Sequence, residues 1–224
     1  MNTSILKILI TLLFTFGICT QVSSFGLPDM PKLPGKSSDS KPIDLKGGKT
    51  ELVDKFFKSS NHYLAALALL NKSLGKNTEA AQIEKEIEYA NNPGIDEADR
   101  MKNSIKTANE ASKAIEADLG NEATSISTEG KVYYAQSLPE AIKGLAGTVK
   151  MVPVTKRMVN GIKASPMSAF KQIGGVAKVI PSLPSYMQTI QKTMNLIRIK
   201  AKAQGIDGAD DPALEAEEAS FDIK

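Results

Sequence analysis

Cysteine is almost absent from this chain of 224 residues, and Cys19 is its only example. One cysteine cannot form a disulfide within the chain, and it cannot supply the thiolate cluster of a structural zinc site. Cys19 also lies in an N-terminal segment that we expect to be removed, so the mature chain has no thiol nucleophile. Its stability must therefore come from the packing of apolar side chains.

Histidine and aromatic residues are also scarce. The chain has one histidine, His62, and no tryptophan, and aromatic residues make up 5% of it. His62 lies at helical spacing among apolar neighbours, which indicates a surface or partly buried helix residue. No phosphate-binding loop, HExxH or GxSxG motif occurs. We therefore predict that the protein is not an enzyme and has no cofactor; an enzyme that uses carboxylates alone is the catalytic alternative.

Clusters of acidic residues do not match known metal patterns. The di-iron pattern of helical bundles needs Glu-x-x-His pairs, and the chain has none. Residues 207–211 (DGADD) resemble part of a calcium-binding loop but lack its later glycine and its terminal glutamate. We predict no metal site.

The first 24 residues have the pattern of an export signal. Residues 8–18 form an apolar run that suits the core of a signal peptide and is too short to span a bilayer as a helix. Small residues at 22–24 provide a cleavage site, so we predict that the mature chain begins at Phe25. The expected location is periplasmic or secreted, in the envelope of a bacterial cell.

Cys19 provides an alternative to simple cleavage. A bacterial lipoprotein carries its acylated cysteine at the end of the apolar run, where Cys19 lies. Such sites have Leu three residues earlier and Gly or Ala immediately before, whereas this chain has Phe16 and Ile18. Cleavage before Phe25 therefore fits the sequence better than acylation.

The mature chain divides into three parts by composition. Residues 25–49 are rich in proline, glycine, serine and lysine, which predicts a flexible leader. Residues 50–205 have helical periodicity and form the predicted bundle domain, beginning with Thr50 as a helix cap. Residues 206–224 form an acidic tail.

The periodicity predicts an all-α fold, a bundle of five or six helices. Three helices are expected over residues 50–75, 77–89 and 96–119. In the second half we expect a helix that starts at Leu138-Pro139 and is bent or broken at Pro153, and then helices over 167–180 and 185–205. Gly174-Gly175 is expected within a helix, where it permits close helix approach. The methionines predicted to lie in the core are Met151, Met158, Met167, Met187 and Met194.

Charge is segregated along the chain. Residues 77–130 hold twelve acidic and five basic side chains, a net charge of −7. Residues 131–204 hold twelve basic side chains and one acidic, a net charge of +11. Residues 205–224 hold seven acidic and one basic, a net charge of −6. The basic segment therefore pairs either with the acidic helices of the same bundle or with an anion outside it.

The basic segment resembles an interfacial surface because its cations alternate with apolar residues and not with glutamate. Its aromatic residues form no stacking platform, so we exclude nucleic acid as a partner. The leading hypothesis is an interaction protein that docks onto a protein assembly or an anionic membrane surface of the envelope. The predicted anion- or partner-binding residues are Lys143, Lys150, Lys156, Arg157, Lys163, Lys171 and Lys178.

A second function remains open from the sequence. A periplasmic carrier would hold an apolar ligand, such as a lipid, between the later helices, where methionine side chains adapt to different shapes. The predicted pocket residues are Met158, Val159, Phe170 and Met194. The acidic tail is further expected to lie over the basic segment and to mask it.

Overall fold

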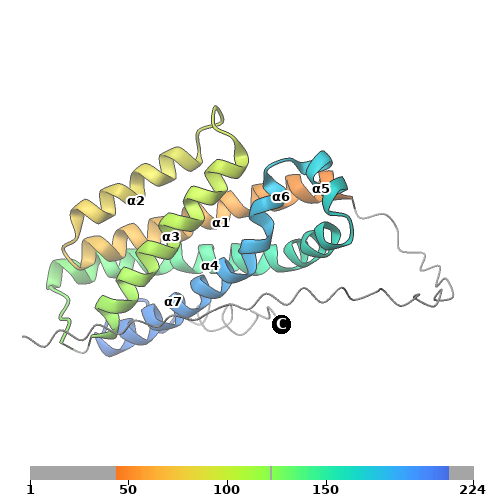
Figure 1. Ribbon diagram of the computed structural model, residues 1–224. Coiled ribbons are helices and arrows are strands. Elements are labelled where there is room, and N and C mark those ends of the chain that lie inside the picture. Colours follow the sequence, from red (N-terminus) through yellow and green to blue (C-terminus); the bar gives the residue numbers. More distant parts are fainter. Residues whose placement is uncertain (1–43, 122, 212–224) are drawn as a thin grey trace, which may run out of the picture. The chain divides into compact units, whose positions relative to one another are not determined.

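The computed structural model describes residues 44–121 and 123–211, which all belong to one contact unit. These ranges contain helices and no strand, so the predicted all-α class is confirmed (Figure 1). The predicted signal peptide, most of the predicted leader and residues 212–224 of the predicted tail lie outside the described residues. The elements are α1 (Leu45–Ser73), α2 (Asn77–Ala90), α3 (Glu97–Gly120), α4 (Thr128–Ala164), α5 (Pro166–Ile173), α6 (Val176–Val179), a 3-10 turn η1 (Ile180–Ser182) and α7 (Leu183–Ala203).

The first helix begins earlier than the sequence indicates. The Asp44 side chain caps α1 by accepting a hydrogen bond from the Gly47 N–H at 2.9 Å. Thr50 lies inside the helix, where its hydroxyl donates to the Lys46 carbonyl. The prediction of Thr50 as the cap was wrong because Asp44 supplies the cap and Leu45 adds a buried apolar side chain just after it. Helices α2 and α3 begin and end within a residue of their predicted bounds.

Helix α4 is longer than predicted and runs through both of its prolines. It starts at Thr128, capped by Ser127, and includes Pro139 and Pro153. Both prolines are exposed, so the carbonyl groups that lose their N–H partners lie on the side of the helix that water reaches. The predicted start at residue 138 was therefore wrong, and of the bend or break predicted at Pro153 the break does not occur.

The predicted helix over 167–180 is instead two short helices. Gly174 has a φ of +59°, a conformation that glycine adopts more readily than other residues, and it ends α5. A Cβ on Gly175 would lie 3.1 Å from the Cβ of Ala98, so Gly175 does permit close packing, against the start of α3. The last helix begins at Leu183 with Pro184 in its first turn.

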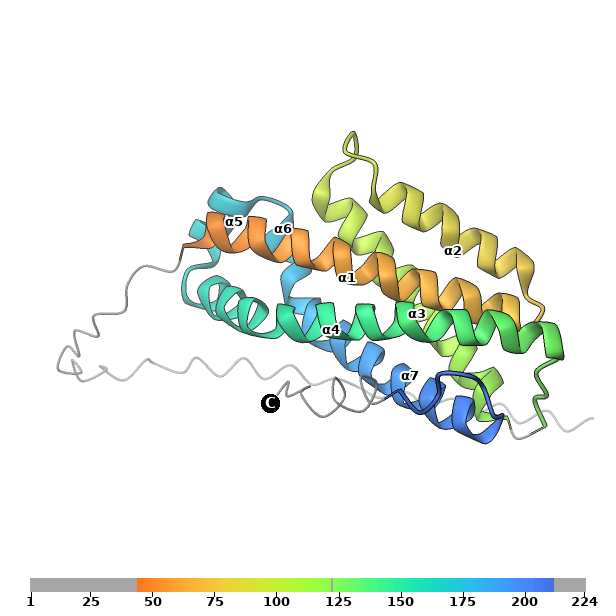
Figure 2. The same ribbon diagram turned by 180° about the vertical axis from the view of Figure 1, so that it is seen from behind.

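An antiparallel pair, α1 and α4, forms the centre of the bundle (Figure 2). Gly144 lies against the backbone of Tyr63, and Gly147 lies against Ser59, where an added Cβ would come within about 3 Å of the facing helix. The Ser59 hydroxyl donates to the Gly144 carbonyl at 2.7 Å. Helices α2 and α3 pack on α1, and α7 packs on α3 and α4.

The start of the predicted acidic tail belongs to the bundle. Ile206 and Ala209 are 4% exposed, and Gly208 lies beside Leu138 of α4. Burial of these two apolar side chains fixes residues 206–211 on the helices. Residues 206–211 of the predicted tail are therefore packed on the bundle.

Candidate functional site

The seven basic residues predicted to bind an anion are all exposed. Five of them lie on α4, and Lys171 and Lys178 lie on α5 and α6. Two are paired within the bundle: Lys143 with Glu140 at 2.7 Å, and Arg157 with Glu51 at 2.8 Å. Across residues 44–121 and 123–211, no acidic group pairs with the other five, which are Lys150, Lys156, Lys163, Lys171 and Lys178.

Glu140 is the one acidic residue of the basic segment, and it bridges α4 and α1. It lies 2.6 Å from the Nδ1 atom of His62 and also pairs with Lys143. Burial alone would raise the pKa of Glu140, but the hydrogen bonds from Lys143 and His62 outweigh it and hold this pKa below its ordinary value. The only histidine of the chain thus takes part in a hydrogen-bonded cluster with Glu140, which also pairs with Lys143.

Within the described residues, ion pairs between the acidic segment 77–130 and the basic segment involve α7, and neither α4 nor α5. Lys192 of α7 pairs with Glu116 of α3 at 2.5 Å, and the Thr193 hydroxyl donates to the same carboxylate at 2.8 Å. The side chain of Lys200 donates to the Asn121 carbonyl at the end of α3. The interpretation that acidic and basic segments face each other therefore holds for α7, whereas the cations near α5 point to solvent.

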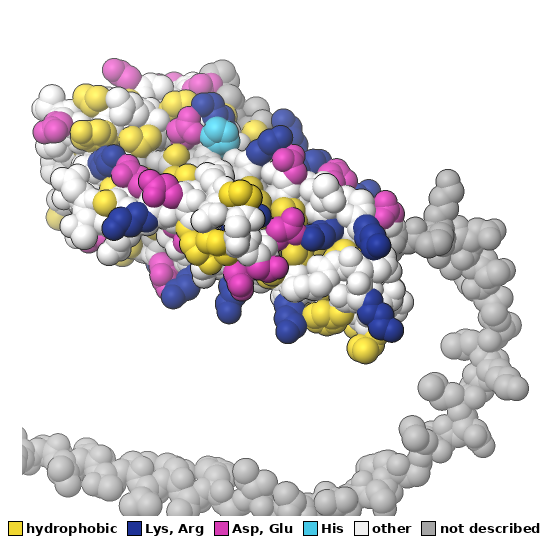
Figure 3. Space-filling model, turned by 90° about the horizontal axis from the view of Figure 1, so that it is seen from above, with side chains coloured by type: hydrophobic (Ala, Val, Ile, Leu, Met, Phe, Trp, Pro, Cys, Tyr) yellow, Lys and Arg dark blue, Asp and Glu magenta, His cyan; other side chains and the backbone are white. Residues whose placement is uncertain are grey.

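Exposed apolar side chains accompany the unpaired cations on α5. Met167 is 74% exposed and Phe170 is 40% exposed. The Lys178 ammonium lies 5.8 Å from the centre of the Phe170 ring. Hydrophobic and basic side chains lie next to each other at this end of the bundle, at the lower right of Figure 3. We call this surface the basic end, defined by Met167, Phe170, Lys163, Lys171 and Lys178.

The core position predicted for Met167 was wrong. Helix α5 has only eight residues, and it buries Ala169 and Ile173 on one side. Met167 lies at the first turn and faces away from that side, so its side chain has no partner helix. The short length, set by Pro166 and by Gly174-Gly175, was the signal that could have indicated this. The other four methionines predicted for the core are buried.

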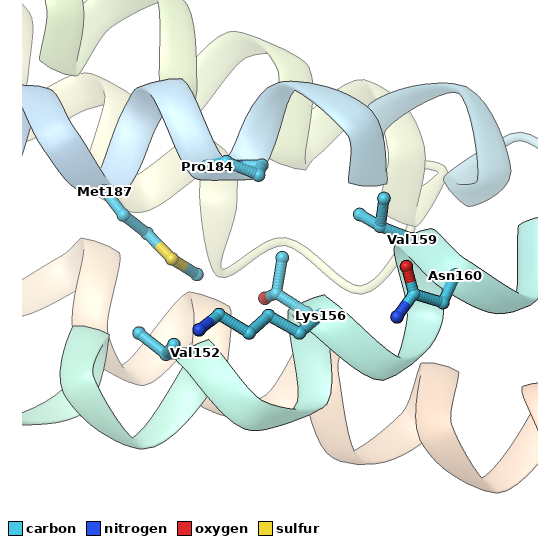
Figure 4. A pocket seen from close by; sticks show the side chains of 7 residues that line it. Val152, Lys156, Val159, Asn160, Pro184 and Met187 are labelled. Atoms are coloured by element: carbon cyan, nitrogen blue, oxygen red, sulfur yellow. The ribbon is translucent and has the colours of Figure 1, made fainter. Parts of the chain in front are cut away.

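A groove of about 280 Å³ lies between α4 and α7. Figure 4 shows Pro184 and Met187 of α7 facing Val152, Lys156 and Val159 of α4 across it. Its walls are mostly apolar and contain no acidic residue. No local sequence pattern predicted this groove, because its two walls come from helices far apart in the chain. The lining residues are Val152, Thr155, Lys156, Val159, Asn160, Pro184 and Met187.

The four residues predicted to hold an apolar ligand do not meet. Val159 lines the groove, whereas Met158 is fully buried against Gly48 of α1. Met194 is also fully buried, in α7, and Phe170 is exposed at the basic end. The structure therefore divides these residues among the core, the groove and the surface.

Within 44–121 and 123–211, no three acidic, histidine or cysteine side chains are grouped as metal ligands would be. No helix in the described part of the chain has the length and apolar character to cross a bilayer. The chain matches no protein-family model, and comparison with curated proteins and with solved structures gave no match.

Proposed function

We propose that the protein is an exported, non-enzymatic docking protein of the cell envelope whose basic end binds an anionic membrane surface. The observation that carries the proposal is the exposure of Met167 and Phe170 beside three lysines that have no acidic partner in the described residues. An apolar pair flanked by cations fits the boundary between phospholipid headgroups and acyl chains. The export signal expected over residues 1–24 supports an envelope location.

The expected binding is peripheral and reversible. Each lysine near an anionic surface contributes about 1 kcal/mol, and burial of apolar area contributes roughly 25 cal/mol per Å². Three lysines and two apolar side chains together support association of a folded domain, not insertion across the bilayer. A docking site on an acidic protein would use the same lysines but would not need an anionic lipid.

Vesicle co-sedimentation tests the basic end directly. The protein should begin at Phe25, so that the apolar run over residues 8–18 does not itself insert into lipid. We expect a Met167→Ser/Phe170→Ser variant to bind phosphatidylglycerol vesicles about tenfold more weakly, because the apolar contact with the interface is lost. Both side chains are exposed, so the variant should keep its helical circular dichroism and its melting temperature.

Charge neutralisation gives a matched comparison. Lys163→Gln/Lys171→Gln should weaken binding to the same vesicles roughly thirtyfold, because about 2 kcal/mol of attraction is lost. Lys106→Gln/Lys113→Gln changes two exposed lysines of α3 and should leave binding within about twofold of the parent. Equal losses for both pairs would indicate non-specific charge attraction and would contradict a localised basic end. Docking on an acidic protein would appear as failure to bind every vesicle.

A further inference from the structure

The groove between α4 and α7 has the right chemistry for an acidic, partly apolar peptide. Val152, Val159, Pro184 and Met187 form apolar walls, and Lys156 supplies a positive charge without an acidic partner in the described residues. We propose that residues 212–224 of the same chain dock in this groove. The consequence for membrane binding rests on the proposed function, but the docking itself does not.

The composition of residues 212–224 complements the groove. This segment holds four acidic side chains and one basic side chain, a net charge of −3. Leu214, Phe221 and Ile223 are its large apolar residues. Phe221 in the apolar part of the groove would place Asp222 near Lys156, so burial and charge attraction would act together.

The chain leaves the bundle within reach of the groove. Gly208 lies beside Leu138 of α4, and the groove residue Lys156 lies 18 positions further along this helix. At 1.5 Å per residue this is about 27 Å. The nine steps from residue 212 to Phe221 span about 30 Å when extended. Phe221 can therefore reach the groove, whereas the same segment as a continuous helix would be too short.

The path between these points offers further contacts. Ile142 and Val149 of α4 are partly buried apolar residues between Leu138 and the groove. An extended segment along this edge of α4 would cover their exposed surface. It would also bring four carboxylates toward Lys156 and the basic end, and so lower the positive potential that attracts an anionic membrane.

Disulfide trapping tests the docking in the intact mature chain. The chain from Phe25 has no cysteine, so two introduced cysteines form a unique pair. Under mild oxidation we expect Val159→Cys/Phe221→Cys to cross-link at least tenfold faster than Lys150→Cys/Phe221→Cys. Lys150 is an exposed position of α4 that lies nearer to Leu138 along the helix but does not line the groove. Reach alone would therefore favour the control pair.

One further variant separates docking from simple proximity. Lys156→Glu in the Val159→Cys/Phe221→Cys background should slow cross-linking several-fold in low salt, and the difference should shrink in high salt as screening increases. Equal rates for the Val159 and Lys150 pairs would overturn the proposal. No lipid is present in these reactions, so their outcome does not depend on whether the basic end binds membranes.

Truncation then measures the consequence for the proposed function. Removal of residues 212–224 leaves the packed residues 206–211 in place and should strengthen binding to phosphatidylglycerol vesicles several-fold. Cross-linking without a change in vesicle binding would retain the docking and reject its masking role. If the cross-link forms in the full mature chain but the truncated chain binds no vesicles, the proposed membrane function fails and the docking stands.

Discussion

Replacement of Gly144 by valine should destabilise the protein by about 3 kcal/mol, because the new side chain would force α1 and α4 apart. A Cβ at this position would lie 3.0 Å from the backbone nitrogen of Tyr63 and 3.1 Å from its Cα atom. These are backbone atoms, so no side-chain rotation can relieve the contact. Separation of the helices would also weaken the 2.7 Å hydrogen bond from Ser59 to the Gly144 carbonyl. For a domain of this size, the melting temperature should fall by about 6–12 °C.

Gly120 provides the control for this substitution. It lies at the end of α3, and no atom of a neighbouring group comes within 4 Å of a Cβ added there. Gly120→Ala should therefore be neutral or should stabilise the protein by up to about 1 kcal/mol, through a smaller entropy of the unfolded chain. Thermal unfolding followed by circular dichroism compares the two variants. A Gly144→Val variant as stable as the parent would show that α1 and α4 do not pack closely.

Alkaline pH should unfold the bundle because three tyrosines are buried in it. Tyr63, Tyr134 and Tyr186 are at most 1% exposed. Burial raises the pKa of Tyr63 to about 12, even though its hydrogen bond with Ser112 favours the ionised form. Burial also raises the pKa of Tyr134 and of Tyr186. All three groups therefore stay protonated in the folded state at a pH where the unfolded chain ionises.

The direction of the pH effect follows from proton binding. Above the unfolded pKa of about 10, the unfolded chain holds fewer protons than the folded protein, so stability falls as pH rises. Each buried tyrosine contributes a slope of about 1.4 kcal/mol per pH unit, and the three together contribute about 4. A domain whose stability lies in the lower part of the usual range, about 5–10 kcal/mol, should therefore lose its fold between about pH 11 and pH 12.5.

Tyrosinate absorbance and far-ultraviolet circular dichroism, recorded on the same samples, check this expectation. Ionisation of the three buried tyrosines should coincide with the loss of helix. Tyr134→Phe should reduce the pH slope by about a third, although it also removes the hydrogen bond from this hydroxyl to the Ile197 carbonyl at 2.7 Å. Ionisation of all five tyrosines of the chain near pH 10 with the helices intact would contradict the burial.

Helix caps and apolar periodicity in the sequence predicted the helices whose ends are set by their own residues. The caps and periodicity of α2 and α3 lie within the helices themselves, so their bounds were predicted within a residue. The continuity of α4 depends on which side of the helix Pro139 and Pro153 occupy, and only the packing against α1 decides that. Proline therefore indicated a break where the folded protein has none.

The candidate site was predicted only in part, because its remaining features depend on how helices pack against one another. The sequence located the basic segment, but pairing could not be assigned without the fold, and Arg157 proved to face Glu51 of α1. Met167 was predicted to be buried, because periodicity does not show that an eight-residue helix has no neighbour on one side. The groove arises from two helices far apart in sequence, so no local pattern encodes it.

Binding of the mature protein to vesicles of different charge, measured at increasing salt, tests the proposed membrane docking most directly. We expect binding to phosphatidylglycerol vesicles at low salt, weaker binding as the Debye length falls from about 10 Å at 0.1 M to about 3 Å at 1 M, and no measurable binding to phosphatidylcholine vesicles. The Met167→Ser/Phe170→Ser variant should bind more weakly than the parent at every salt concentration. Equal binding to charged and neutral vesicles, or binding that both substitutions leave unchanged, would contradict a membrane-docking role for the basic end.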